Sequence, residues 1–290
     1  MDGLLLNPKT KQQLQYFVTQ PSHTVTLVGT AGIGKGTIAR HLAAKLLDLP
    51  IEKLKSYPYL KIYVPENNTI SIDIARNIVS FTKLKTAGQR AIRRVIIIED
   101  AQALTSEAQN ALLKTLEEPP ADTVFILTIT STANILPTIL SRTQTLSLQP
   151  IEQAKFVDYF IKLGHEQQEI VQYFYMTGGL PGLTYALLAE NDSHHLVQSV
   201  QLAKSILQAD TFERLTMIDD IVKQKQTKEV IAALSTISRT AMYVEASREN
   251  SKDTTLRRWA SVLQTAEQAG ENIRKNAQAK LVLTSLFLEI

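Results

Sequence analysis

Hydrophobic and polar positions in the first half of the chain predict short strands separated by helices. Short apolar runs rich in β-branched residues are typical of strands buried in a parallel sheet, whereas apolar residues that recur every three or four positions indicate a helix. Because strands alternate with helices, we expect an α/β fold with one parallel sheet and right-handed crossovers. Strands are expected at 24–28, 60–64, 94–98, 123–130 and 143–148, and helices after residue 36, at 72–82 and at 106–118.

After Pro150 the strand pattern fades, and helical spacing continues to the end of the sequence. Residues 151–190 are typical of short helices interrupted by the glycine-rich stretch 177–182, and the last apolar stripe is LVLTSLFLEI. We therefore predict three domains: an α/β domain over residues 1–150, a small helical domain over 151–192 and an all-helical domain over 193–290.

The composition is that of a soluble globular protein and excludes several kinds of site. Of the 290 residues, 44% are hydrophobic and 20% are charged, and the formal net charge of +3 is too small to argue for nucleic-acid binding by itself. The absence of cysteine excludes disulfides and thiolate metal sites and agrees with a reducing cytoplasm, and the histidines show no metal-ligand spacing. No segment resembles a signal peptide or a membrane span, so we expect a cytoplasmic protein without a metal site.

The stretch GTAGIGKGT, residues 29–37, is close to the phosphate-binding pattern G-x-x-x-x-G-K-[ST]. It lies between an expected strand and an expected helix, the context that such a loop requires. Its backbone N–H groups can bind phosphate oxygens, and Lys35 can neutralise their charge. In the pattern the residue after the lysine gives Mg²⁺ a hydroxyl, but here that residue is Gly36, and the hydroxyl comes one position later, at Thr37.

Two carboxylates, Glu99 and Asp100, follow the expected strand at 94–98. In phosphate-loop proteins this place holds Mg²⁺ or orients the attacking water, usually with aspartate first and glutamate second. The reversed order puts the longer side chain at the metal position and the shorter one beside the water. The alternative is that both carboxylates only cap the strand end and the following loop. Together with Gly36, the reversed order predicts weak or absent nucleotide binding and no ATP hydrolysis by the chain alone.

The segment EAQNALLKTLEEPP, residues 107–120, follows the acidic pair and is very similar to a segment characteristic of the clamp-loader branch of AAA+ proteins. Ser141, Arg142 and Thr143 resemble that family's Ser-Arg-Cys motif, with threonine in place of cysteine. The resemblance implies an AAA+ domain, a helical lid and a helical collar over the three predicted regions. Other similar segments are ISIDIARNI at 70–78, GGLPG at 178–182 and NAQAKLVLTSLFLEI at 276–290, so the likeness runs from about residue 10 to the last residue.

Departures from the family pattern distinguish among its members. Motor subunits of the gamma or tau type have threonine or serine after the loop lysine, an Asp-Glu pair and an arginine in the lid. These motors, and many delta-prime subunits, also carry a four-cysteine zinc module. This chain has Gly36, the reversed acidic pair, Leu183 and no cysteine. With Ser141 and Arg142 retained, it resembles the delta-prime class, which keeps the AAA+ fold, lends its arginine to a neighbouring subunit and usually does not hydrolyse ATP.

The resemblance implies a set of site residues and partners. Arg142, with Ser141, is implied as an arginine finger acting on ATP held by a neighbour. Implied partners are the gamma or tau and delta subunits, bound through the AAA+ and collar domains, with the sliding clamp and primer-template DNA in the complex; no membrane is implied. ATP or ADP with Mg²⁺ stays open as a cofactor. The degenerate nucleotide site comprises Gly29, Gly32, Gly34, Lys35, Gly36, Thr37, Glu99, Asp100 and Thr130, the last near the family's sensor 1 position.

Two other functions stay open at this point. One is an active AAA+ ATPase, either a motor subunit or a stand-alone DNA-remodelling protein with unusual motifs. The other is a protein-interaction module unrelated to replication. Basic and aromatic residues do not decide among them: Arg93 and Arg94 are expected on a solvated turn, and Trp259, beside Arg257 and Arg258, is expected in a core.

Overall fold

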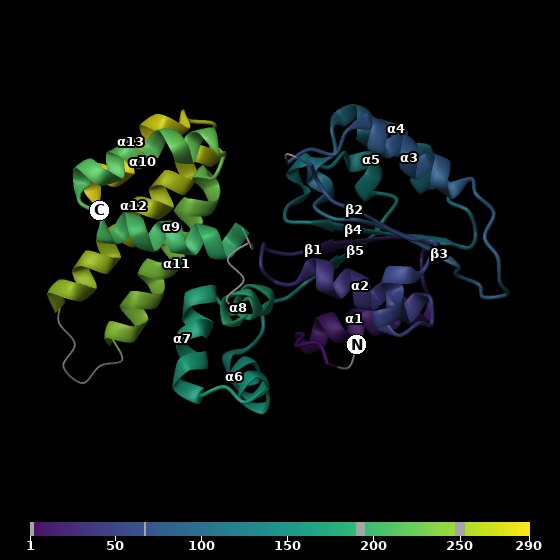
Figure 1. The fold of residues 1–290 in the computed structure, drawn as a ribbon, viewed down its shortest axis with the longest axis horizontal. Helices are drawn as coiled ribbons and strands as arrows, with labels where there is room; N and C mark the ends of the chain where they lie inside the picture. The colour runs from purple at the N-terminus through teal and green to yellow at the C-terminus, as the bar shows by residue number, and fades with distance from the viewer. Residues whose placement is uncertain (1–2, 67, 190–194, 247–252) are drawn as a thin grey trace. The chain divides into compact units, whose positions relative to one another are not determined.

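The computed structural model describes residues 3–66, 68–189, 195–246 and 253–290, and it divides into two compact units, Met1–Ile151 and Glu152–Ile290 (Figure 1). The first unit holds the glycine loop, the acidic pair and Arg142. The boundary that the sequence predicts at residue 192 lies outside the described residues, so the separation of a lid from a collar stays a prediction.

A five-stranded parallel sheet in the order β2-β3-β4-β1-β5 forms the centre of the first unit. Every residue of β3 and β4 is buried, as expected for strands covered on both faces. The predicted α/β class is confirmed, and each strand ends within one residue of its predicted bounds. The strands are β1 (Thr24–Val28), β2 (Leu60–Tyr63), β3 (Arg94–Ile98), β4 (Thr123–Ile129) and β5 (Gln144–Ser147).

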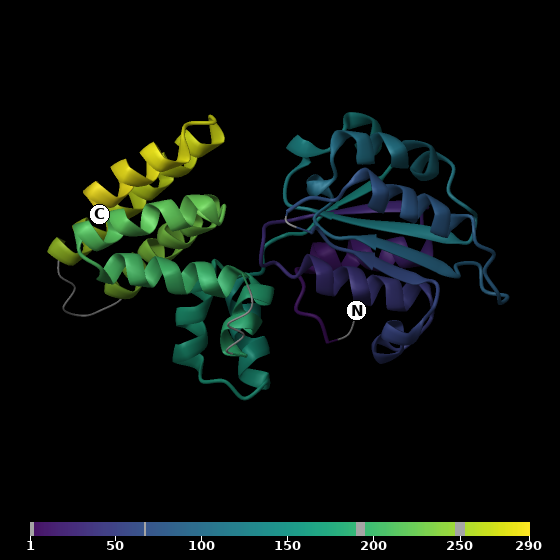
Figure 2. The ribbon, with the colours of Figure 1, turned by 45° about the horizontal axis from the view of Figure 1, so that its top comes forward.

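Helices cover both faces of this sheet. In the two views, α3 and α4 lie on one face, whereas α1 and α2 lie on the other (Figures 1 and 2). The helices are α1 (Pro8–Thr19), α2 (Lys35–Leu46), α3 (Ile72–Thr82), α4 (Ser106–Glu117) and α5 (Pro137–Leu140), with short 3-10 turns at Ile51–Ser56, Ala101–Ala103 and Thr132–Asn134.

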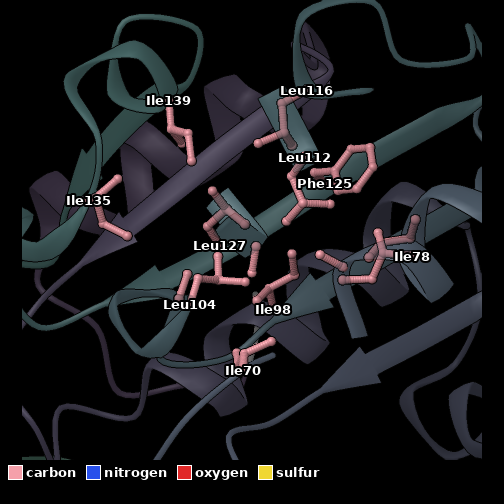
Figure 3. Packing of buried hydrophobic residues seen from close by; sticks show 14 of the residues in the cluster. Ile70, Ile78, Ile98, Leu104, Leu112, Leu116, Phe125, Leu127, Ile135 and Ile139 are labelled. Carbon is pink, nitrogen blue, oxygen red and sulfur yellow. The ribbon is translucent and has the colours of Figure 1, made fainter. Parts of the chain in front are cut away.

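Apolar packing fixes α4 on the sheet. Leu112 and Leu116 of α4 lie in one buried cluster with Phe125 and Leu127 of β4, and the close view shows these side chains facing one another (Figure 3). Burial of a side chain of this size contributes roughly 1.5–3 kcal/mol. The packing of α4 on the sheet therefore fixes the positions of the residues at its two ends.

The parallel arrangement gives the sheet two distinct edges. Val25 pairs with Gln144 and Val28 with Ser147, so β1 and β5 start together and end together. Carboxyl ends of parallel strands share one edge, and the amino ends share the opposite edge. The glycine loop, which follows β1, and the acidic pair, which follows β3, lie at the carboxyl edge, whereas Arg142, which precedes β5, lies at the amino edge.

The described residues of the second unit form only helices. Among the described residues of the whole chain, none of the helices has the length and apolar character needed to span a bilayer. The helices are α6 (Gln153–Lys162), α7 (Gln167–Thr177), α8 (Pro181–Leu188), α9 (His195–Gln208), α10 (Thr211–Lys223), α11 (Thr227–Ala246), α12 (Asp253–Arg274) and α13 (Ala279–Glu289).

Two sequence expectations about basic and aromatic residues are wrong. Arg94 is not on a solvated turn: it is 1% exposed, and its guanidinium donates to the carbonyl oxygens of Thr82, the last residue of α3, and of Leu84, two residues beyond it. Burial lowers the pKa of Arg94, and the charge of Asp122 opposes that shift. Charged hydrogen bonds to helix-end carbonyls compensate for taking this cation out of water. Trp259 is only partly buried, with Arg258 Cζ 5.7 Å from its ring centre.

Candidate functional site

The glycine loop connects β1 to α2, as the sequence predicts. Gly32 and Gly34 have φ angles of 83° and 93°, a conformation that L-residues with a side chain rarely adopt. Gly34 is the residue that caps α2, whose first N–H groups open toward the loop. The backbone thus retains the strand-loop-helix geometry of a phosphate-binding loop.

Lys35 lies against this loop and is largely buried. Its Nζ donates to the carbonyl oxygens of Gly29 at 2.9 Å and Thr30 at 3.2 Å. Burial lowers the pKa of Lys35, and the negative charges of Asp100 and Glu99 oppose that shift. The lysine ammonium is therefore bound to the chain's own loop carbonyls.

The space beside Gly36 is filled by an ion pair. Arg40 Nη2 lies 2.8 Å from Glu99 Oε1. A Cβ atom added to Gly36 meets Arg40 Nη1 at 2.8 Å and the two carboxylate oxygens of Glu99 at 3.0 and 3.1 Å. A serine or threonine at this position therefore requires the side-chain ends of Arg40 and Glu99 to shift.

These residues do not fit a Mg²⁺ ion bound together with a nucleotide. Position 36 offers no hydroxyl, and the Glu99 carboxylate is already neutralised by Arg40. Thr37 does not substitute, because successive helical residues are about 100° apart around the axis. Sequence reasoning identified Gly36 and Glu99 but missed Arg40, although its position one helical turn after Gly36 places it on the same face of α2.

Asp100 and Thr130, two further members of the predicted nucleotide site, are both hydrogen-bonded to the side chain of Gln102. Asp100 has a φ of 46°, and its N–H donates to Thr128 Oγ1 at 3.0 Å. Gln102 donates from Nε2 to Asp100 Oδ1 at 3.2 Å, and its Oε1 accepts the N–H of Thr130 at 3.2 Å. The Asp100 carboxylate accepts from Gln102 and makes no capping hydrogen bond to the 3-10 turn that follows it, so the capping interpretation stays a prediction for this residue. Sequence reasoning missed Gln102, because no local pattern marks a contact between two different strand ends.

Arg142 lies on the surface just after α5. Its Nη2 is 3.0 Å from Glu117 Oε1, and its Nη1 donates to the carbonyl oxygen of Thr138 at 3.0 Å and to Ser141 Oγ at 3.4 Å. The side chain of Arg142 is 35% exposed and that of Glu117 is 52% exposed. The predicted pair of Ser141 and Arg142 is thus brought together, and Glu117 joins it.

The structure separates Arg142 from the chain's own glycine loop. The loop follows β1 and Arg142 precedes β5, so they lie at opposite edges of the sheet, separated by the length of a strand. A strand of this length spans roughly 16 Å at about 3.3 Å per residue. Arg142 therefore does not belong to the same site as Lys35 and Glu99.

The lid position also supplies no cation in this chain. Leu183, which stands where the resemblance implies an arginine in motor subunits, is 6% exposed in an apolar cluster with Ala186 and Val197.

Comparison with known proteins identifies relatives. A family model described as "DNA polymerase III, delta subunit" matches residues 7–152. The chain is 37% identical over 139 residues to the DNA polymerase III subunit delta' of Pseudomonas aeruginosa, a match that covers 42% of each chain. It is 32% identical over 183 residues to the subunit delta' of Haemophilus influenzae, which covers 58% of this chain and 55% of the relative. The chain therefore spans about half the length of these relatives.

One solved structure matches almost the whole chain. It is a DNA polymerase III gamma subunit-related protein from Thermotoga maritima, with a TM-score of 0.50 at 18% identity, covering 96% of this chain and 97% of the other. At this level of identity the likeness shows the fold alone, a parallel α/β sheet domain followed by helices.

Proposed function

Because the chain belongs to the family described as "DNA polymerase III, delta subunit", we propose that it acts as a delta-prime-like subunit of a bacterial clamp loader. Its work is to complete a ring of AAA+ subunits and to present Arg142 to the ATP held by a neighbouring motor subunit. The partners in this proposal are gamma or tau and delta subunits, joined through the AAA+ and collar regions, together with the sliding clamp and primer-template DNA.

One observation carries the proposal: Arg142 is partly exposed at the sheet edge opposite to the chain's own loop. An arginine in that place cannot act on a nucleotide at its own loop, but it is accessible to a neighbour. A guanidinium beside a transferring phosphoryl group stabilises the negative charge that develops there, and such fingers are worth about 10³ to 10⁵ in rate.

The carboxyl edge supports the other half of the proposal, in which the chain itself does not hydrolyse ATP. The ion pair of Arg40 and Glu99 occupies the space in which a motor subunit requires a hydroxyl and a free carboxylate. This arrangement argues against the alternative of an active AAA+ ATPase. Measurable ATP turnover by the purified chain, abolished by Lys35→Ala, is the result that favours that alternative.

The experiment is reconstitution of this chain with its cognate motor and delta subunits. Stimulated ATP hydrolysis is measured in the presence of clamp and primed DNA. The motor subunits carry alanine in place of their own Ser-Arg arginine, so that the site beside this chain is the only complete one. Arg142→Ala is expected to lower turnover at that site by about 10³-fold or more.

The matched control is Arg76→Ala, since Arg76 is also a surface arginine in an ion pair, here with Asp73 at 3.1 Å. It is expected to leave hydrolysis unchanged. Undiminished hydrolysis with Arg142→Ala contradicts the proposed role. Failure of the chain to associate with any clamp-loader subunit favours an interaction module of another kind.

A further inference from the structure

The carboxylate of Glu117 is the charged partner of Arg142, and the structure assigns Glu117 as the residue that positions this arginine toward the neighbour's ATP. The inference rests on the proposed function, in which Arg142 acts in trans. Glu117 itself touches no nucleotide in this inference and acts only through the guanidinium, 3.0 Å away.

The helix dipole does not favour a glutamate at this position. Glu117 is the last residue of α4, and the negative end of the helix dipole disfavours a carboxylate there. Glu117 forms an ion pair with Arg142, which comes from a segment 25 residues later in the chain. The contact between the two side chains is therefore a tertiary one. It forms although the helix dipole slightly disfavours a carboxylate at the end of α4.

A second polar residue of α4 holds the beginning of the same segment. Gln109 is 4% exposed; its Nε2 donates to the carbonyl oxygen of Asn134 at 2.9 Å, and its Oε1 accepts the N–H of Leu136 at 2.8 Å. Gln109 and Glu117 are two turns apart on α4, so they contact the segment that carries Arg142 at its start and at its end. Since α4 is packed on the sheet through Leu112 and Leu116, it forms a fixed base for the arginine.

The hydrogen bonds around Arg142 leave part of its donor set available. A guanidinium has five N–H groups in a planar fork. Within the described part of the chain, the three contacts to Thr138, Ser141 and Glu117 use Nη1 and one N–H of Nη2. Nε–H and the other N–H of Nη2 take part in none of these three contacts, so donors remain for phosphate oxygens. Glu117 thus restricts the orientation of the guanidinium without using all of its donors.

The test uses the reconstituted complex in which the site beside this chain is the only complete one. Glu117→Ala is expected to lower the kcat of stimulated hydrolysis by about two- to fivefold, the range for a partly exposed ion pair, with the KM for ATP unchanged. Glu117→Gln, which keeps an oxygen acceptor, is expected to retain more of the rate than alanine. The matched control is Glu118→Ala, because Glu118 is the neighbouring glutamate and is not among the contacts of Arg142.

A double-mutant cycle separates positioning from a general structural effect. In the Arg142→Ala background, Glu117→Ala is expected to have no further effect on kcat, because the side chain through which it acts is gone. An equal loss in both backgrounds, a loss as large with Glu118→Ala, or a faster enzyme with Glu117→Ala overturns the inference. Thermal unfolding of each variant shows whether the chain is folded.

Failure of this inference is distinguishable from failure of the proposed function. An effect of Arg142→Ala without an effect of Glu117→Ala leaves the arginine finger intact and removes only the positioning role. If Arg142→Ala has no effect, both the arginine finger and the positioning role are contradicted.

Discussion

The two edges of one sheet each carry an arginine-glutamate ion pair, and the two pairs differ in what surrounds them. At the carboxyl edge, Arg40 and Glu99 lie 2.8 Å apart beside Gly36. At the amino edge, Arg142 and Glu117 lie 3.0 Å apart on the surface. The arginine side chains are similarly exposed, at 41% and 35%, but the glutamates are exposed by 20% and 52% respectively.

The burial of the glutamate carboxylate determines whether its arginine partner is able to contact another molecule. Removing the partner of a mostly buried carboxylate costs more than removing the partner of an exposed one, so Glu99 holds Arg40 more firmly than Glu117 holds Arg142. An exposed ion pair contributes only about 0.2–1 kcal/mol, because water solvates the separated charges. Arg142 can therefore contact a neighbour's phosphate while it stays paired with Glu117. The same pair of residue types thus blocks the chain's own nucleotide site at one edge and provides an arginine for a neighbour's site at the other.

The largest expected difference between the two edges is the effect on hydrolysis of replacing the arginine by lysine. Arg142→Lys keeps the charge but loses the planar fork, and we expect it to lower hydrolysis at the neighbouring site by roughly tenfold to a hundredfold. Arg40→Lys is the matched change at the other edge and is expected to leave hydrolysis unchanged. Single-turnover measurements in the reconstituted complex compare the two, and equal losses contradict the division of roles.

A second prediction concerns the closed edge. Gly36→Thr combined with Arg40→Ala restores a hydroxyl and removes the cation that neutralises Glu99, and we expect Mg-ATP to bind about tenfold more tightly, or better, than to the wild type. Isothermal titration calorimetry measures the affinity, with Gly36→Thr alone as the control that keeps Arg40. Micromolar binding by the wild-type chain, abolished by Lys35→Ala, contradicts the closed site.

A third prediction uses the buried lysine of the same edge. Because burial lowers the pKa of Lys35 in the folded chain, the unfolded chain binds its proton more tightly. The free energy of unfolding of the wild type, relative to Lys35→Met, is then expected to rise with pH through the interval between the lowered pKa and the ordinary value of 10.5.

Urea denaturation at a series of pH values measures this difference in the free energy of unfolding between the wild type and Lys35→Met. Contributions from groups that titrate alike in both proteins cancel in the difference. Lys45→Met, at an exposed position on the same helix, is the control. A difference that stays level or falls as the pH rises contradicts the role of burial at Lys35.

The smallest effect is expected where the arginine segment meets the sheet. Thr26 Oγ1 of β1 donates to Thr143 Oγ1 at 3.0 Å, and Thr26 is 1% exposed. Thr143→Val leaves a buried hydroxyl without this partner and is expected to lower the free energy of unfolding by about 1 kcal/mol. The double variant with Thr26→Val is expected to recover much of that loss, and chemical denaturation of the three variants checks it.

Local patterns predicted the strands and the helices α3 and α4 of the first unit within about a residue, because its sheet is buried on both faces. They did not predict α1 or α5. A buried strand such as β3 must be a short apolar run, and a helix such as α4 must repeat its apolar positions at helical spacing, whatever their partners are. The patterns failed at Arg94, where a cation begins a buried strand. Its burial depends on carbonyl groups at the end of α3 and just after it, which no pattern local to residue 94 records.

By itself, the sequence determined the α/β fold, the strand-loop-helix at 29–37, the missing hydroxyl at Gly36 and the presence of Ser141 and Arg142, since each depends on residue type and near-neighbour spacing. Only the tertiary structure decided which glutamate each arginine meets. Arg40 and Glu99 are brought together by β3 and α2, and Arg142 and Glu117 by α4 and the segment before β5. Those encounters are set by the strand order and by packing across the sheet, where residues far apart in the chain share one edge.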